Sequence, residues 1–179
     1  MIKNNRFSQS DSLLLALIQK NAKRVHSLIN QLLDIRKIET NTLRLKLERF
    51  DVIDLCQKQY DSFQEMAERK HINFRFEADH KSFIFEGDKT RLESIIQNLL
   101  SNAFKFTPSN GSIDFKLETL TQSSIKLSIK DNGIGIPNEK RTHLFERFHQ
   151  EKSSSSNMTG NGIGLNIAKE YCDLMNGKI

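Results

Sequence analysis

The sequence NLLSNAFKF occupies residues 98–106 and decides how the rest of the chain is interpreted. On a helix, Asn98, Asn102 and Lys105 share one face, because residues three and four positions apart are neighbours. Amide oxygens are hard ligands that suit magnesium, and a lysine adds a point charge for phosphate. A solvated polar face is the alternative, although asparagine is a poor helix former and two of them at this spacing need a reason.

The sequence DNGIGIP at residues 131–137 follows an alternating, strand-like run. A strand that ends in Asp131 places a carboxylate at the edge of a sheet, where it can accept a hydrogen bond from an exocyclic amine such as that of adenine. Gly133 and Gly135 would let a flat ligand approach the backbone closely. A simple Asp-x-Gly turn after a strand is the alternative.

A third segment, GNGIGLNIAK at residues 160–169, leads from a serine-rich stretch into an amphipathic helix. Free backbone N–H groups and the positive end of the helix dipole make a helix start suitable for phosphate. The segment lacks the Gly-Lys-Ser/Thr of a Walker A loop, and Ile167 stands where a dinucleotide fingerprint wants a third glycine. A flexible loop with a helix cap is the alternative.

Composition restricts the class of protein. The 179 residues are 37% apolar and 27% charged, which is typical of a globular chain and not of a disordered one. The longest apolar run, residues 13–18, is too short to cross a bilayer, and no signal peptide is recognisable. Two cysteines cannot form a disulfide framework or a multi-cysteine zinc site, so a reduced cytoplasmic setting is expected. The net charge of +5 is dispersed among both signs, which disfavours nucleic acid as a partner.

A long helix is expected over residues 12–39, because apolar residues recur there at steps of three, four and seven. Its apolar face is too broad to stand alone in water. The helix lies either on the core of its own chain or against a second copy in a bundle or coiled coil. The second interpretation is favoured because the helix is long and lies at one end of the chain.

The remaining pattern predicts an α+β fold, a two-layer sandwich of helices on one mixed, mostly antiparallel sheet, preceded by a long α-helical dimerisation arm. We expect the arm over residues 1–46 and the sandwich over 47–179. Asp51 and Asp88 are expected to cap the two main helices. The elements expected after the arm are a strand or extended linker at 40–50, helices at 52–70 and 89–106, strands at 72–77 and 83–86, a hairpin at 112–119 and 124–130, and helices at 139–148 and 163–175.

Together these segments resemble the four boxes of the catalytic and ATP-binding domain of sensor histidine kinases, within the ATPase group that includes gyrase, Hsp90 and MutL. Residues 98–106 resemble the N box and 131–136 the first glycine box. The sequence LFERF at 144–148 resembles the F box, and 160–165 the second glycine box. The resemblance covers residues 50–179, and the preceding helix is similar to the second helix of the dimerisation and histidine-phosphotransfer domain.

The resemblance implies ATP and Mg²⁺ as cofactors. Asn102 would bind the metal with help from Asn98, Lys105 would contact phosphate, and these three would form the catalytic set. Phe106 would lie by the purine and Asp131 would accept from its amino group. The other nucleotide-contacting residues that the resemblance implies are Gly133, Gly135, Ile136, Arg147, Gly160, Gly162, Ile163, Gly164 and Leu165.

One position separates the subclasses of this group. Relatives that hydrolyse ATP usually carry glutamate one helical turn before the magnesium-binding asparagine, as a general base. Here that residue is Asn98, which is neutral and cannot accept the proton of water. The sequence therefore favours transfer of the γ-phosphoryl to a histidine, with relay to an aspartate of a response regulator. A non-catalytic nucleotide-sensing dimerisation module and a gyrase-like ATP hydrolase are the alternatives.

Two parts of the family pattern are missing. No helix with a histidine followed by an acidic residue precedes the arm, and His26 lacks such a neighbour. The closing strand expected after Ile179 is also lacking. We therefore expect a cytoplasmic fragment that cannot phosphorylate itself. Its parent protein would be a sensor, which an anchor in the inner membrane would suit. Expected partners are a second copy, through the N-terminal helix, and a response-regulator receiver domain, with no nucleic acid and no membrane contact.

Overall fold

The computed structural model describes residues 9–146 and 162–179, which divide into two compact units, Met1–Leu43 and Arg44–Ile179. In the first unit, helix α1 runs over Gln9–Glu39, close to the predicted range. It ends where Asn41 adopts a left-handed backbone conformation and the Thr42 amide donates to the Lys37 carbonyl over 2.8 Å. Many of its apolar side chains are half exposed: Leu14, Leu15, Leu17, Ile18, Val25, Ile29, Leu32 and Leu33.

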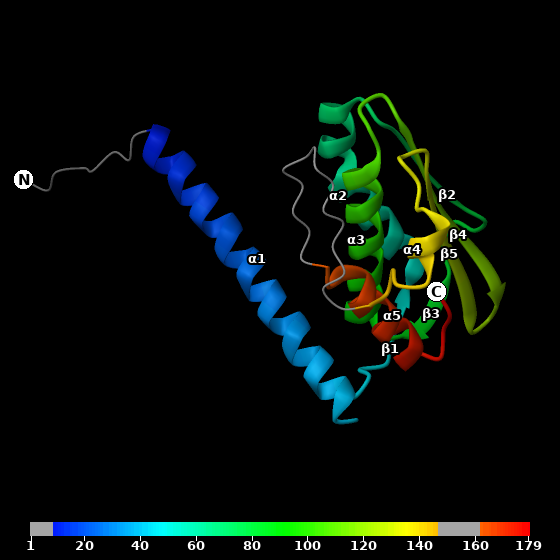
Figure 1. Ribbon diagram of the computed structural model, residues 1–179. Helices are drawn as coiled ribbons and strands as arrows, with labels where there is room; N and C mark the ends of the chain where they lie inside the picture. Colours follow the sequence, from blue (N-terminus) through cyan, green and yellow to red (C-terminus); the bar gives the residue numbers. More distant parts are fainter. Residues whose placement is uncertain (1–8, 147–161) are drawn as a thin grey trace, which may run out of the picture. The chain divides into compact units, whose positions relative to one another are not determined.

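The strands of the second unit form two sheets (Figure 1). Strands β1 (Glu48–Asp51) and β3 (Ile84–Gly87) make an antiparallel pair. In the other sheet, β4 (Ser112–Thr121) lies parallel to β2 (Asn73–Ala78) and antiparallel to β5 (Ser124–Asp131). The arrangement is mixed and mostly antiparallel, as predicted, although the expected single sheet is divided in two.

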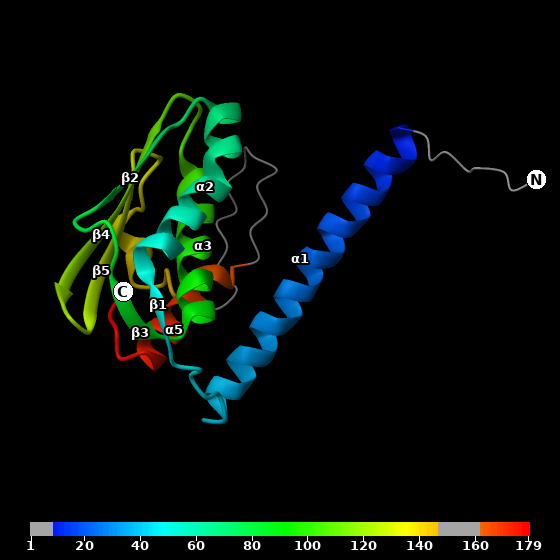
Figure 2. The same ribbon diagram turned by 180° about the vertical axis from the view of Figure 1, so that it is seen from behind.

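Helices cover one face of the three-stranded sheet. Both α2 (Val52–Lys70) and α3 (Lys89–Phe106) lie on the same side of it in the two opposite views of Figures 1 and 2. Helix α5 (Gly164–Leu174) packs against α3, and α4 (Asn138–Arg141) is a single turn. The predicted α+β class, with helices layered on a mixed sheet, is confirmed.

The two predicted helix caps are present. Asp51 Oδ1 accepts a hydrogen bond from the Ile53 amide over 2.9 Å at the start of α2. Asp88 Oδ1 accepts from the Arg91 amide over 3.0 Å at the start of α3. Asp88 is only 4% exposed, and its second oxygen accepts from the Lys46 amide over 3.0 Å. This carboxylate therefore fixes both the start of α3 and the segment that leads into β1.

The core lies between α2, α3 and the inner face of the three-stranded sheet. Its fully buried side chains include Leu55, Ile96, Leu100, Phe104, Ile113, Phe115 and Leu117. The outer face of the sheet carries charges instead, with Lys116 paired to Glu77 at 2.6 Å and Lys126 to Glu118 at 2.7 Å. Inner and outer residues alternate along β4, which explains why its sequence alternates.

The structure decides between two alternatives at one place and corrects a predicted helix at another. Of the strand or extended linker expected at 40–50, residues 42–47 form a linker, in which the Lys46 amide donates to the Asp88 side chain, and strand β1 begins at Glu48. The helix expected over 139–148 is shorter within the described residues, since α4 ends at Arg141 and turns follow up to residue 146; residues 147 and 148 lie outside them.

Within the described residues, no helix combines the length and apolar character needed to cross a membrane.

Candidate functional site

Helix α3 carries the three residues that the sequence singled out, Asn98, Asn102 and Lys105, and each is half-buried. The Asn98 Nδ2 donates to the Ser94 carbonyl over 2.8 Å, one turn back along the helix. Its amide nitrogen is therefore occupied by its own helix, and its Oδ1 faces away from that bond.

The start of α5 lies directly against this amide. A Cβ atom added to Gly164 would lie 2.8 Å from Asn98 Oδ1, so any larger residue there would require the Asn98 side chain to shift. Glycine at this position thus allows the N-terminus of α5 to sit on the asparagine face of α3. Just before it, Gly162 has a left-handed backbone with φ of 64°, and Ile163 is buried. The structure thus places Gly164, within the second glycine segment, beside Asn98.

At the other end of α3, the first glycine segment makes an equally close approach. A Cβ on Gly133 would lie 2.5 Å from the Phe106 carbonyl oxygen and 2.8 Å from Asp131 Oδ1. The Lys105 ammonium lies 4.8 Å from the centroid of the Phe106 ring, within the range of a cation–π interaction. Lys105, Phe106, Gly133 and Asp131 therefore form one cluster where α3 ends and β5 ends.

The carboxylate in this cluster is exposed to solvent. Asp131 is the last residue of β5, and its Oδ1 accepts a hydrogen bond from the Gly133 amide over 2.9 Å. Gly135 has a left-handed backbone with φ of 68°, and an added Cβ would meet no atom within 4 Å. Ile136 is 46% exposed. An accessible acceptor beside an open glycine turn can receive a donor group of a flat ligand.

Two of the expected nucleotide contacts, Arg147 and Gly160, lie outside the described residues. Leu165 is half-buried in the first turn of α5. No group of three or more His, Cys, Asp or Glu side chains that could hold a metal occurs among residues 9–146 and 162–179. A metal bound at this site would therefore depend on amide oxygens, which Asn98 and Asn102 supply, and on ligand phosphates.

Sequence reasoning missed residues that brace the site. Asn166 on α5 is only 7% exposed, and its Nδ2 donates to the Phe145 carbonyl over 2.8 Å. The Arg91 guanidinium of α3 lies 5.0 Å from the centroid of the Tyr171 ring of α5. Lys70 of α2 donates to the last turn of α3. A polar residue on the apolar face of the last helix was the signal available for Asn166.

Comparison with known proteins identifies the family to which this chain belongs. The chain belongs to the histidine kinase-, DNA gyrase B- and HSP90-like ATPase family, whose model matches residues 87–179. The likeness is to the ATP-binding domain of sensor histidine kinases. Over 92% of its length, the chain is 34% identical to histidine kinase P4 of Formosa agariphila. Over 91% of its length, it is 37% identical to sensor histidine kinase TmoS of Ectopseudomonas mendocina.

A solved structure agrees with this assignment. The catalytic domain of histidine kinase ThkA superimposes with a TM-score of 0.64 at 27% identity, covering 73% of this chain and 82% of that one. The chain spans only 12% of the length of histidine kinase P4 and 17% of that of TmoS. It therefore corresponds to one region of much longer proteins.

Proposed function

We propose that this chain is the ATP-binding catalytic part of a two-component sensor histidine kinase. The observation that carries the proposal is that both glycine segments close onto one helix, Gly164 against Asn98 and Gly133 against Phe106. Three stretches far apart in sequence thereby meet around a face of amides and a lysine. The full protein would transfer the γ-phosphoryl of Mg-ATP to a histidine on another helix, for relay to a response-regulator aspartate.

Each residue has a distinct role in this proposal. Asp131 accepts from the adenine amino group, and the turn at Gly133 and Gly135 admits the base. Asn102 and Asn98 hold Mg²⁺ through their amide oxygens, and Lys105 lies by the phosphates. The metal, when bound, would neutralise part of the negative charge of the phosphates. The amide of Asn98 takes up no proton, so the site positions ATP for an external nucleophile without activating water.

The arm and the partners complete the proposal. The half-exposed apolar side chains of α1 fit a seam between two copies of the chain. The receiver domain of a response regulator would engage the full-length protein. Nucleic acid and membrane are not proposed as partners of this region, and a cytoplasmic location is proposed for it.

Nucleotide binding is the first test. Calorimetry should show that the chain binds ADP in the presence of Mg²⁺. Asp131→Asn should weaken binding at least about tenfold, since a site built to accept from an amine loses its charged acceptor. Gln97→Ala, an exposed change on the same helix as Asn102, should leave affinity unchanged. A wild-type chain that binds no adenine nucleotide would contradict the proposal.

Phosphotransfer is the second test. A helix that carries a phosphoacceptor histidine is supplied as a separate polypeptide together with labelled ATP, and an acid-labile, base-stable phosphoprotein is expected on that polypeptide alone. Label on the chain itself would implicate His26. Steady phosphate release that Asn98→Ala abolishes would support the gyrase-like hydrolase instead, and binding with neither reaction would support a nucleotide-sensing module.

A further inference from the structure

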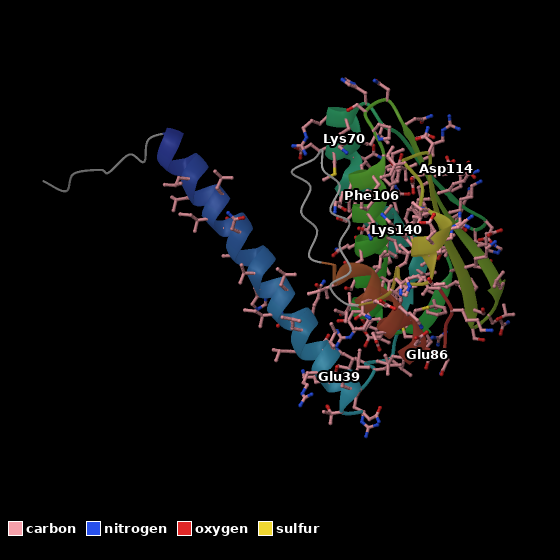
Figure 3. All side chains as sticks on the ribbon, in the orientation of Figure 1. Glu39, Lys70, Glu86, Phe106, Asp114 and Lys140 are labelled. Atoms are coloured by element: carbon pink, nitrogen blue, oxygen red, sulfur yellow. The ribbon has the colours of Figure 1, made fainter. Side chains whose placement is uncertain are left out.

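Lys70, the last residue of α2, extends its side chain to the end of α3. Its ammonium donates to the Phe104 carbonyl over 2.5 Å and to the Thr107 carbonyl over 3.3 Å. The last carbonyl groups of a helix have no partner within it, and a cation there also interacts favourably with the helix dipole. Figure 3 labels Lys70 on α2 and Phe106 on α3.

The two carbonyls that Lys70 binds lie on either side of Lys105 and Phe106 in sequence. The backbone carbonyl of Lys70 accepts in turn from the Asn110 amide over 3.1 Å, in the turn after α3. One residue of α2 thus holds the end of α3 through its side chain and the following turn through its backbone.

The end of α3 in turn supports the loop after β5. The Phe106 carbonyl is the atom that a Cβ on Gly133 would strike. Next to Gly133, Asn132 Oδ1 accepts from the Ser112 amide over 2.8 Å, and a Cβ on Gly111 would lie 2.8 Å from that same oxygen. Displacing the α3 terminus would therefore displace the turn after β5, whose Gly133 amide donates to Asp131 Oδ1.

We propose that Lys70 is a positioning residue for the nucleotide site. It fixes residues 104–107, which include Lys105 and Phe106, and, through them, the turn that follows Asp131. This inference rests on the proposed function, because the ligand it serves is an adenine nucleotide. The competing interpretation is that Lys70 only stabilises the fold and has no specific effect on the site.

The test compares Lys70→Met, which keeps the apolar stem but loses the donors, with Lys70→Arg, which keeps the positive charge and donors. Lys58→Met is the control, because it removes an exposed lysine of α2 that pairs with Asp54 at 2.7 Å. ADP affinity with Mg²⁺ is measured by calorimetry well below the melting temperature, and the melting temperature is measured without nucleotide.

Lys70→Met should weaken ADP binding at least about fivefold. Misplacing a site by about 1 Å can reduce its function by up to about a hundredfold, so a loss of this size is expected. Lys70→Arg should recover most of that affinity, and Lys58→Met should match the wild type. A lower melting temperature with unchanged ADP affinity would overturn the proposal, as would Lys70→Arg binding as weakly as Lys70→Met. A Lys70→Met chain that does not fold would also overturn it, because Lys70 would then serve the whole fold. Absence of ADP binding by the wild type would instead overturn the proposed function.

Discussion

Helices α1 and α3 have similar apolar repeats but differ sharply in burial. On α3, Leu92, Ile96 and Leu100 are 6%, 0% and 0% exposed, because α2, α5 and the sheet surround them. On α1, Ile29 and Leu33 are 50% and 52% exposed. A spacing of three and four residues predicts that a helix has an apolar face, but it does not say what covers that face.

The largest expected effect tests the burial itself. Leu100→Ala should lower the free energy of unfolding by about 2–5 kcal/mol, since it empties a fully buried position. Leu33→Ala, the same change on α1, should alter it by less than about 0.5 kcal/mol at concentrations where the chain is monomeric. Urea titration followed by circular dichroism measures both. Equal losses would mean that Leu33 is as deeply packed as Leu100.

The second prediction concerns what covers α1. If two copies bury this face together, Ile29→Asp should raise the dimer dissociation constant at least about tenfold, because a buried isoleucine contributes about 1.5–3 kcal/mol. Asn30→Asp places the same charge one residue away, at an exposed polar position, and should have a much smaller effect. Sedimentation equilibrium separates the two variants. A wild type that is monomeric at every concentration would favour the alternative that α1 lies on its own chain.

The third prediction concerns the start of α3, the more deeply buried of the two helices. Asp88→Ala should reduce the free energy of unfolding by about 1–2 kcal/mol, because α3 loses its cap and the Lys46 amide loses its acceptor. Asp88→Asn keeps an oxygen acceptor and should recover much of this loss. Thermal unfolding of the two variants is the measurement, and equal destabilisation by both would argue against a capping role.

The smallest expected effect is on how the free energy of unfolding depends on pH in acid. Burial raises the pKa of Asp51, but hydrogen bonds from the Ser82 hydroxyl and the Phe83 and Ile53 amides outweigh it, so the pKa lies below its ordinary value of 3.8. The folded state then binds fewer protons than the unfolded state, so this stabilisation is complete above pH 3.8 and is lost as pH falls through the folded pKa. Unfolding measured against pH should show a shallower acid loss for Asp51→Asn than for the wild type. If the free energy of unfolding fell equally with pH in both proteins, Asp51 would not contribute to the acid sensitivity.

The sequence predicted features that depend on local chemistry. Asp51 and Asp88 could be recognised as caps because the signal lies within one turn of each helix. The grouping of β1 with β3 could not be predicted, because alternation marks a strand but does not identify its neighbour. Residues 42–47 alternate like a strand, yet the backbone there is engaged by Asp88 from a distant part of the chain.

The candidate site shows the same division. Asn98, Asn102 and Lys105 were predictable as one helical face, and the glycines marked places where backbone approaches closely. The partner of each glycine, Asn98 for Gly164 and Phe106 for Gly133, depends on tertiary packing that no local pattern encodes. Lys70 was overlooked because a lysine in the last turn of a helix is ordinarily solvated, and its acceptors lie more than thirty positions away in sequence.

The parallel pairing of β2 with β4 has a consequence for how the protein folds. The chain between these strands includes β3 and all of α3, so the strands can meet only after a long connection has closed. Contacts between residues distant in sequence slow folding because they restrict chain entropy before they stabilise anything. Hydrogen-exchange labelling during refolding should therefore show α3 and the central strand gaining protection in the same kinetic phase.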